Sequence, residues 1–173
     1  MQGLKSAIDP LKADLLERNV TSPKLLGCMG GSNGGLLVGN MLVRPGSAER
    51  FAAVVCQCPL LDMRRFHKLL AGASWMAEYG NPDTEDWEYM KLWSPYQNLS
   101  PDKEYPKVYY WTNTRDDRVH PAHARKMVAR LQEFGKLVYY YENTEGGHGG
   151  GTNPNQRAYT SALSYAYLWK MLR

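Results

Sequence analysis

A glycine-rich pentapeptide contains the strongest candidate nucleophile of this sequence. Residues 30–34 read Gly-Gly-Ser-Asn-Gly and fit the pattern G-x-S-x-G, with Ser32 at the centre. In that pattern a tight turn between a strand and a helix holds the serine in a strained backbone conformation, and glycines beside it avoid side-chain clashes. Because a helix start directs N–H groups and a positive dipole end to the same point, we expect the main chain of Asn33 to stabilise a developing oxyanion.

The same pentapeptide has a second interpretation. Glycine-rich turns between a strand and a helix also serve packing alone, or bind phosphate at the helix N-terminus. A serine hydroxyl becomes a good nucleophile only when a histidine accepts its proton, and that histidine needs an acid that fixes its tautomer. The rest of the sequence therefore decides between the two interpretations.

An acid and a histidine follow in the expected order. Asp116 and Asp117 come directly after one predicted strand, and His148 lies among glycines after the next. Loops at the carboxyl ends of parallel strands gather at one edge of a sheet, so Ser32, one of the two aspartates and His148 can converge there. The spacing does not choose between the aspartates. The other histidines lack such a setting, and we expect surface or structural roles for His67, His120 and His123.

The elements that must position these residues alternate between strand and helix. Short apolar runs bounded by glycine or proline predict strands at residues 24–29, 52–58, 107–112 and 137–141. Helical spacing predicts helices at residues 7–18, 34–43, 124–134 and 159–169, and residues 60–105 indicate a helical excursion. Since parallel strands need crossover connections, this alternation predicts an α/β fold with a mostly parallel sheet and flanking helices.

Length and composition favour one globular domain over residues 1–173. Of the 173 residues, 43% are hydrophobic and 22% are charged, close to soluble globular averages. The net charge of +4 arises from interspersed residues without a basic block, so we expect no nucleic-acid partner. The chain has no apolar run near the roughly 18 residues needed to cross a bilayer and no apolar stretch like that of a signal peptide. We therefore expect a soluble, cytoplasmic protein with no membrane partner.

The three cysteines do not form a recognisable metal pattern. Cys28, Cys56 and Cys58 contain no paired C-x-x-C units. Free cysteines usually behave as small buried hydrophobes. We expect three buried thiols, with Cys56 and Cys58 on the same face of one strand, and we expect no metal and no organic cofactor.

In combination these segments resemble the catalytic domain of the prolyl oligopeptidase family of serine peptidases, which has the α/β-hydrolase fold. The similarity spans almost all of the chain. It rests on segments 21–24, 30–38, 62–68, 75, 78–80, 94–96 and 116–119. The resemblance implies that Ser32 is the nucleophile and His148 the general base. It also implies that Asp116 rather than Asp117 is the triad acid, because the family's first acid lies three residues before the valine.

The resemblance further implies residues that bind substrate. Arg118 resembles the arginine that holds a carbonyl of the bound peptide, and Trp75 corresponds to the aromatic floor on which a proline ring stacks. The resemblance also places Leu60, Tyr79 and Val119 in the lining of that pocket. Ordinary core packing is the alternative for Trp75 and Tyr79, because burial of an aromatic side chain needs no ligand.

The sequence also departs from the family pattern. Family members carry a β-propeller and further strands before the nucleophile, and these 173 residues contain neither. Those strands supply the second oxyanion donor, whose loss costs roughly 10²–10³ in rate. Their absence leaves the outer edge of the strand before Ser32 uncovered. Because an uncovered edge is a pairing template, we expect a homo-oligomer whose contact covers this edge of the truncated sheet, and continuation of the sheet across a two-fold axis is one such arrangement.

Three functions are compatible with the sequence. The first is a serine hydrolase that cleaves small esters or short peptides through an acyl-enzyme on Ser32, with activated esters as practical substrates and, by the resemblance, cleavage after proline as the inherited chemistry. The second is a truncated, weak or inactive hydrolase fragment that folds by oligomerising. The third is non-catalytic capture of proline-containing peptides by Trp75 and Arg118.

Overall fold

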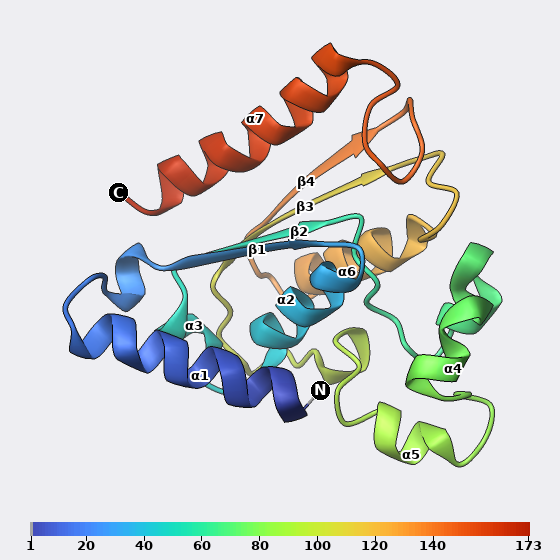
Figure 1. Ribbon diagram of the computed structural model, residues 1–173, viewed down its shortest axis with the longest axis horizontal. Helices are drawn as coiled ribbons and strands as arrows, with labels where there is room; N and C mark the ends of the chain where they lie inside the picture. The colour runs from blue at the N-terminus through green and yellow to red at the C-terminus, as the bar shows by residue number, and fades with distance from the viewer. Residues whose placement is uncertain (1) are drawn as a thin grey trace.

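A parallel sheet of four strands forms the centre of the protein. The computed structural model describes the backbone of residues 2–173 and the side chains of residues 10–173. The strands are β1 (Gly27–Gly31), β2 (Ala53–Gln57), β3 (Lys107–Asn113) and β4 (Val138–Asn143). They pair in the order β1-β2-β3-β4, and every pair is parallel (Figure 1). The predicted α/β fold with a parallel sheet is confirmed.

Helices cover both faces of this sheet. The longer ones are α1 (Gln2–Glu17), α2 (Asn33–Val43), α6 (Ala122–Glu133) and α7 (Pro154–Met171). Short helical turns make up the rest: η1 (Pro23–Leu25), α3 (Ser47–Arg50), η2 (Phe66–Lys68), η3 (Leu70–Trp75), α4 (Met76–Tyr79), α5 (Asp86–Met90) and η4 (Tyr96–Asn98). Helix α7 lies on one face, and α2 and α6 lie on the other (Figure 1). The four predicted helices and the helical excursion over residues 60–105 are confirmed.

Alternation along the strands builds one apolar layer on each face. Val54 and Tyr110 point toward the layer that contains Leu42 of α2 and Leu131 of α6. On the opposite face, the alternate side chains of β2 and β3 form a second apolar cluster with Tyr167 of α7. Burying a large apolar side chain contributes roughly 1.5–3 kcal/mol. The two layers therefore fix the strands side by side, with their carboxyl ends at one edge.

Two sequence expectations about the strands are wrong. The strand predicted at residues 24–29 begins only at Gly27, because Pro23–Leu25 first form the turn η1. Cys56 and Cys58 do not share a face, because β2 ends at Gln57 and Cys58 has a φ of +39°, which breaks the alternation. Cys56 packs in the layer of α2 and α6, and Cys58 packs in the layer of α7. Both are buried free thiols as predicted, whereas Cys28 is only half-buried.

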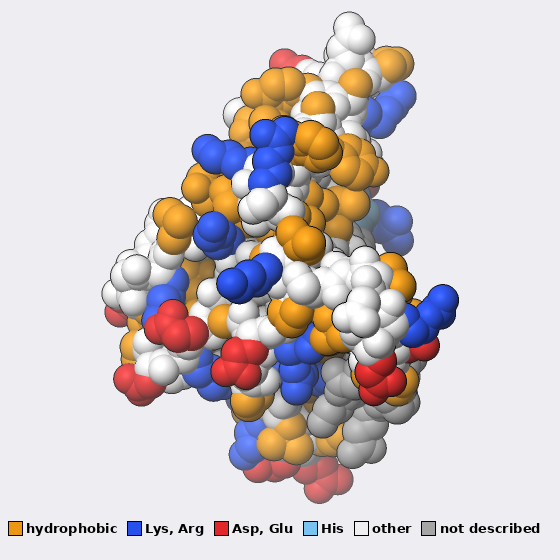
Figure 2. All heavy atoms as spheres, turned by 90° about the vertical axis from the view of Figure 1, so that its left-hand side faces the viewer, with side chains coloured by type: hydrophobic (Ala, Val, Ile, Leu, Met, Phe, Trp, Pro, Cys, Tyr) orange, Lys and Arg blue, Asp and Glu red, His pale blue; other side chains and the backbone are white. Residues whose placement is uncertain are grey.

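The strand that leads to the candidate nucleophile lies at the border of the sheet. In the described sheet β1 pairs only with β2, so one side of its backbone is unpaired, as the sequence predicted. Leu25 and Met29 are 52% and 40% exposed at this border. Figure 2 shows that hydrophobic side chains occupy much of the molecular face at the left of Figure 1. Among the described helices, none combines the length and apolar character that crossing a bilayer requires.

Candidate active site

Ser32 occupies the turn between β1 and α2 in a strained conformation. Its φ and ψ of 55° and −118° lie outside the favourable regions, at a cost of order 1–3 kcal/mol. Neighbouring backbone holds it from both sides. Its N–H donates to the carbonyl of Gln57 at 2.8 Å, and its carbonyl accepts from the N–H of Leu36 at 3.2 Å. The strained turn expected from the G-x-S-x-G pattern is present.

Space at this turn requires glycine at two positions, one of which lies outside the pentapeptide. A Cβ at Gly30 would lie 2.4 Å from the carbonyl oxygen of Gly34, and one at Gly35 would lie 2.7 Å from Cβ of Pro59. A Cβ at Gly34 would meet nothing within 4 Å. The expectation of unavoidable clashes is therefore correct for Gly30 and wrong for Gly34, whose Cβ would point into open space.

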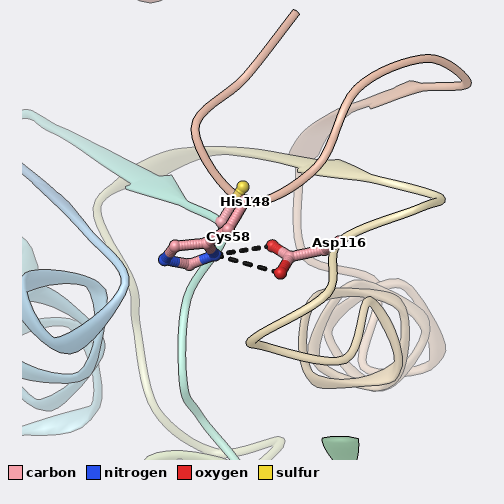
Figure 3. A group of neighbouring side chains, drawn as sticks. All are labelled: Cys58, Asp116 and His148. Carbon is pink, nitrogen blue, oxygen red and sulfur yellow. Dashed lines mark hydrogen bonds and ion pairs between the residues drawn. The ribbon is translucent and has the colours of Figure 1, made fainter. Parts of the chain in front are cut away.

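Asp116 and His148 form a close pair although 32 positions separate them. Nδ1 of His148 lies 2.8 Å from Oδ2 and 3.0 Å from Oδ1 of Asp116 (Figure 3). The carboxylate is buried, and its Oδ1 also accepts the backbone N–H groups of Arg118 at 2.9 Å and Val119 at 2.8 Å. With its proton on Nδ1, as this network assigns it, the imidazole presents Nε2 as a proton acceptor.

The neighbouring aspartate has a different contact. Oδ1 of Asp117 accepts the backbone N–H of His148 at 2.9 Å, and this hydrogen bond is the main reason why the pKa of the carboxyl lies below its usual value. A side chain at Gly147 would collide with the same oxygen at 2.7 Å. Asp116 therefore contacts the imidazole, while Asp117 holds the backbone of the histidine loop.

The ends of adjacent strands bring Ser32 toward this pair. Gly31, Gln57, Trp111 and Tyr141 lie in one row across the four strands. Ser32 follows this row on β1, and Cys58, which lies beside Asp116 and His148, follows it on β2. Within the described residues, the structure records no hydrogen bond between the hydroxyl of Ser32 and His148. Hydrogen bonds between a nucleophile and its base are often long before substrate binds. Ser32 nevertheless lies at the same edge of the sheet as His148.

A cavity of about 250 Å³ lies beside the start of α2. Its lining is Asn33, Leu36, Leu37, Glu78, Tyr79, Tyr89 and Trp93. The hydroxyl of Tyr79 donates to Oδ1 of Asn33 at 2.5 Å. Burial, with the nearby Glu78, raises the pKa of Tyr79 to about 12, so this hydroxyl keeps its proton at neutral pH.

Most of the other expected substrate-binding residues belong to an apolar cluster that shares Leu36 and Trp93 with the lining of this cavity. Leu60 and Val119 are buried in one apolar cluster, and Trp75 and Tyr79 pack against that cluster. Of these four, only Tyr79 lines the cavity, and Arg118 is exposed. Sequence reasoning missed the lining residues Leu36 and Trp93, although the position of Leu36 one helical turn after Ser32 was a usable signal.

The remaining histidines have structural contacts. Nδ1 of the buried His123 accepts the backbone N–H groups of Leu61 at 3.3 Å and Asp62 at 3.0 Å. Nε2 of His67 lies 2.9 Å from Asp83, and Nδ1 of His120 accepts a backbone N–H at 3.0 Å. All three agree with the surface or structural roles expected from the sequence.

Sequence reasoning also missed the position of Cys58. Its Sγ lies with the carboxylate of Asp116 and the imidazole of His148 in one cluster (Figure 3). Burial and the charge of Asp116 raise the pKa of this thiol to about 12. The available signal was its place directly after a strand, which is the place that also marks Asp116 and His148 as candidates.

Known proteins similar to this chain are peptidases. The sequence model of the prolyl oligopeptidase family matches residues 11–173. An uncharacterized peptidase of Sinorhizobium fredii is 48% identical over 92% of this chain and 22% of its own length. A prolyl endopeptidase of Dictyostelium discoideum is 34% identical over 91% of this chain and 21% of its own length.

Solved structures give the same result. The structure of a post-proline cleaving enzyme from Rickettsia typhi superposes with a TM-score of 0.89 at 36% identity, covering 94% of this chain and 23% of that one. Oligopeptidase B from Leishmania major superposes with a TM-score of 0.86 at 25% identity and similar coverage. The chain thus spans less than a quarter of the length of these relatives.

Proposed function

The chain belongs to the prolyl oligopeptidase family of serine peptidases and has its α/β-hydrolase fold, and from this premise we propose that Ser32, Asp116 and His148 are a catalytic triad. The triad cleaves ester or peptide bonds through an acyl-enzyme. The proposal concerns this chain alone, since the chain covers only 22% of the length of its S. fredii relative.

In the proposed triad each group has one role. Oγ of Ser32 attacks the carbonyl carbon, and its proton passes to Nε2 of His148. Asp116, bonded to Nδ1, stabilises the imidazolium that forms. The free N–H groups at the start of α2, beginning with Asn33, face the developing oxyanion. The imidazolium then protonates the leaving alcohol or amine, and water releases the acid by the same steps.

One observation carries this proposal: the pairing of a buried carboxylate with a histidine at the edge where Ser32 lies. Four acceptor contacts fix the carboxylate of Asp116, two from backbone N–H groups and two from Nδ1 of His148. The pair of His67 and Asp83 provides a contrast, because Asp83 is 45% exposed and is shared with Lys68. Of these two pairs, the one at the sheet edge has the buried, oriented acid that a triad needs.

The cavity beside Asn33 indicates the kind of substrate. Apart from Asn33 and Glu78 its lining is apolar or aromatic, and its volume of about 250 Å³ suits a small acyl group or a proline ring. Relatives named prolyl endopeptidases support peptides with proline as natural substrates. Activated esters are the practical substrates of the isolated chain, because they need less oxyanion stabilisation and less protonation of the leaving group than amides.

Hydrolysis of nitrophenyl butyrate tests the proposal. We expect Ser32→Ala to lower kcat/KM by at least about 10³, because no nucleophile remains. Ser74→Ala is the matched control, since Ser74 is exposed and donates to the carbonyl of Ala71. We expect it to leave the rate unchanged. Equal rates for Ser32→Ala and the wild type would reject the triad.

A weak or inactive fragment is the second candidate function, and the unpaired border of β1 supports it. The two candidates differ in whether Ser32 is chemically activated, and fluorophosphonate labelling measures that. Peptide capture by Trp75 is less favoured, because this side chain packs on the apolar cluster and does not line the cavity.

A further inference from the structure

Three side chains at the edge formed by the carboxyl ends of the strands combine the ligand types that zinc prefers. Sγ of Cys58, a carboxylate oxygen of Asp116 and a ring nitrogen of His148 all lie within 4.8 Å of one another (Figure 3). Zinc binds such atoms at about 2.0–2.3 Å in a tetrahedral arrangement, so its ligand atoms lie roughly 3–4 Å apart. The three groups need to move by only about 1 Å to surround one ion.

The fold already places these groups together. Cys58 follows β2, Asp116 follows β3, and His148 follows β4. Cys58 is 3% exposed and Asp116 is 4% exposed, whereas the side chain of His148 is 14% exposed and gives access from the surface. Ligands pre-positioned by three packed strands lose little conformational entropy when they bind a metal.

An unsatisfied polar atom beside the cluster supports a bound ligand. Nδ2 of Asn113 donates to Sγ of Cys58 at 3.5 Å and to the carbonyl of Gly147 at 2.9 Å. Asn113 is 0% exposed, so water from the surface does not reach its Oδ1. This oxygen has no hydrogen-bond partner among the described residues. Buried acceptors are normally satisfied, and a water molecule on a nearby metal would donate to this oxygen.

We propose that Cys58, Asp116 and His148 bind a zinc ion, and that the bound ion switches off the hydrolase. A thiolate and a carboxylate together neutralise the two charges of the ion. On binding, the thiol proton leaves to solvent, and the proton of the imidazole moves from Nδ1, which takes the metal, to Nε2. A protonated Nε2 cannot accept the proton of Ser32, so the acyl-enzyme cannot form.

The switch rests on the proposed function, whereas the metal site does not. Metal binding depends only on the geometry of the three side chains. Cys58 distinguishes this site chemically from an ordinary histidine–carboxylate pair. A soft thiolate strengthens zinc binding far more than a second oxygen ligand does. The His67–Asp83 pair is therefore the natural control, since no cysteine joins it in a cluster of the described residues.

Calorimetric titration of the wild-type chain with Zn²⁺ tests the site. We expect one ion per chain, and an affinity at least about 100-fold weaker in Cys58→Ser, which keeps the size and the hydrogen bonding of the thiol. Cys58→Ala is the second variant should the serine form not fold. Cys28→Ser and His67→Gln should bind as the wild type does. Co²⁺ should give a thiolate-to-cobalt absorption band in the wild type and none in Cys58→Ser.

The outcomes separate the two claims. Absence of stoichiometric zinc binding, or equal affinity in the wild type and both Cys58 variants, overturns the site. The switch is tested by fluorophosphonate labelling of Ser32, which a saturating amount of Zn²⁺ should slow at least tenfold. Labelling that zinc does not slow rejects the switch. A chain that never labels rejects the proposed function together with the switch, and the calorimetry then still decides the metal site.

Discussion

At the scale of single residues, two adjacent aspartates have different contacts. The carboxylate of Asp116 is bonded to the imidazole of His148, while that of Asp117 holds the backbone N–H of the same residue. Removing the charge of Asp116 leaves the imidazole with the wrong tautomer, whereas removing that of Asp117 only loosens a loop. The structure therefore predicts unequal losses of activity.

We expect Asp116→Asn to lower kcat/KM for a nitrophenyl ester by about 10⁴ and Asp117→Asn by less than about tenfold. Both substitutions keep the size of the side chain, so each serves as the other's control. Circular dichroism verifies that both variants fold. Similar losses in the two variants would show that Asp116 has no special role.

A second prediction at this scale concerns His123 of α6, which is buried against the segment that follows β2. Burial lowers the pKa of this imidazole to about 4, while Asp62 and Asp116 oppose that shift and Lys126 and His120 add to it. As pH falls from about 6.5 toward 4, the unfolded chain binds a proton that the folded chain does not. Stability is therefore lost across that window, by roughly 3 kcal/mol for this group.

The variant His123→Asn isolates this effect, because its amide oxygen can accept the same backbone N–H groups and does not titrate. Urea denaturation at pH 7 and pH 4.5 gives the free energy of unfolding of both proteins. We expect the wild type to lose more stability than the variant over this interval. Parallel losses would mean that His123 does not contribute to the pH dependence.

The sequence identified most of these residues but not all of their contacts. Ser32 and His148 were recognisable from glycines and strand ends, which are local features. The choice between Asp116 and Asp117 needed the family pattern, because a difference of one position in a loop has no periodic signal. The proximity of Cys58 to Asp116 and His148 was not predicted, because metal patterns in sequence depend on short spacings, whereas these neighbours come from the loops after β3 and β4.

At the scale of elements, the turn between β1 and α2 depends on Gly30 and not on Gly34. A Cβ at Gly30 would strike backbone atoms of Gly34 at 2.4 and 2.7 Å, and backbone cannot move aside without opening the turn. A Cβ at Gly34 meets open space at the start of a helix, where alanine is intrinsically better than glycine by up to about 1 kcal/mol.

Gly30→Ala should therefore lower the free energy of unfolding by several kcal/mol or prevent folding. Gly34→Ala should leave it unchanged or raise it by up to about 1 kcal/mol. Thermal melts of the two variants beside the wild type measure this difference. A Gly34→Ala variant as unstable as Gly30→Ala would contradict the described turn.

The elements were predictable where their patterns were long. Helices α2, α6 and α7 have at least eleven residues each, enough for their apolar spacing to show. Between β2 and β3 the structure has only turns of three to six residues, and these are too short for a period to emerge. Strand β1 begins later than predicted because the turn η1 precedes it, and the proline at the start of η1 favours a helical turn over a strand.

At the scale of the whole molecule, the candidate site lies at a sheet whose two border strands each have one unpaired side among the described residues. Strand β1 ends at Gly31, directly before Ser32, and lies at one border, and β4 lies at the other. Unpaired N–H and C=O groups along such a border are a template for another strand. We therefore expect the isolated chain to associate through β1 into a dimer or larger homo-oligomer.

Light scattering after size-exclusion chromatography measures the mass at micromolar concentration. We expect at least twice the 19.6 kDa of one chain, and a lower mass for Met29→Lys, which places a charge on the 40% exposed position of β1. Leu92→Lys, at a 70% exposed position outside the sheet, is the control and should not change the mass. A stable wild-type monomer would contradict the expectation.

The most direct test of the triad is covalent labelling of Ser32 by a fluorophosphonate, located by mass spectrometry of the digested protein. An activated serine reacts and an ordinary serine does not, so the measurement is independent of the substrate. We expect one label per chain, on Ser32, and at least about 10³-fold slower labelling in His148→Gln and Ser32→Ala. Unlabelled wild-type protein, or a label that persists at the same rate in His148→Gln, would contradict the account.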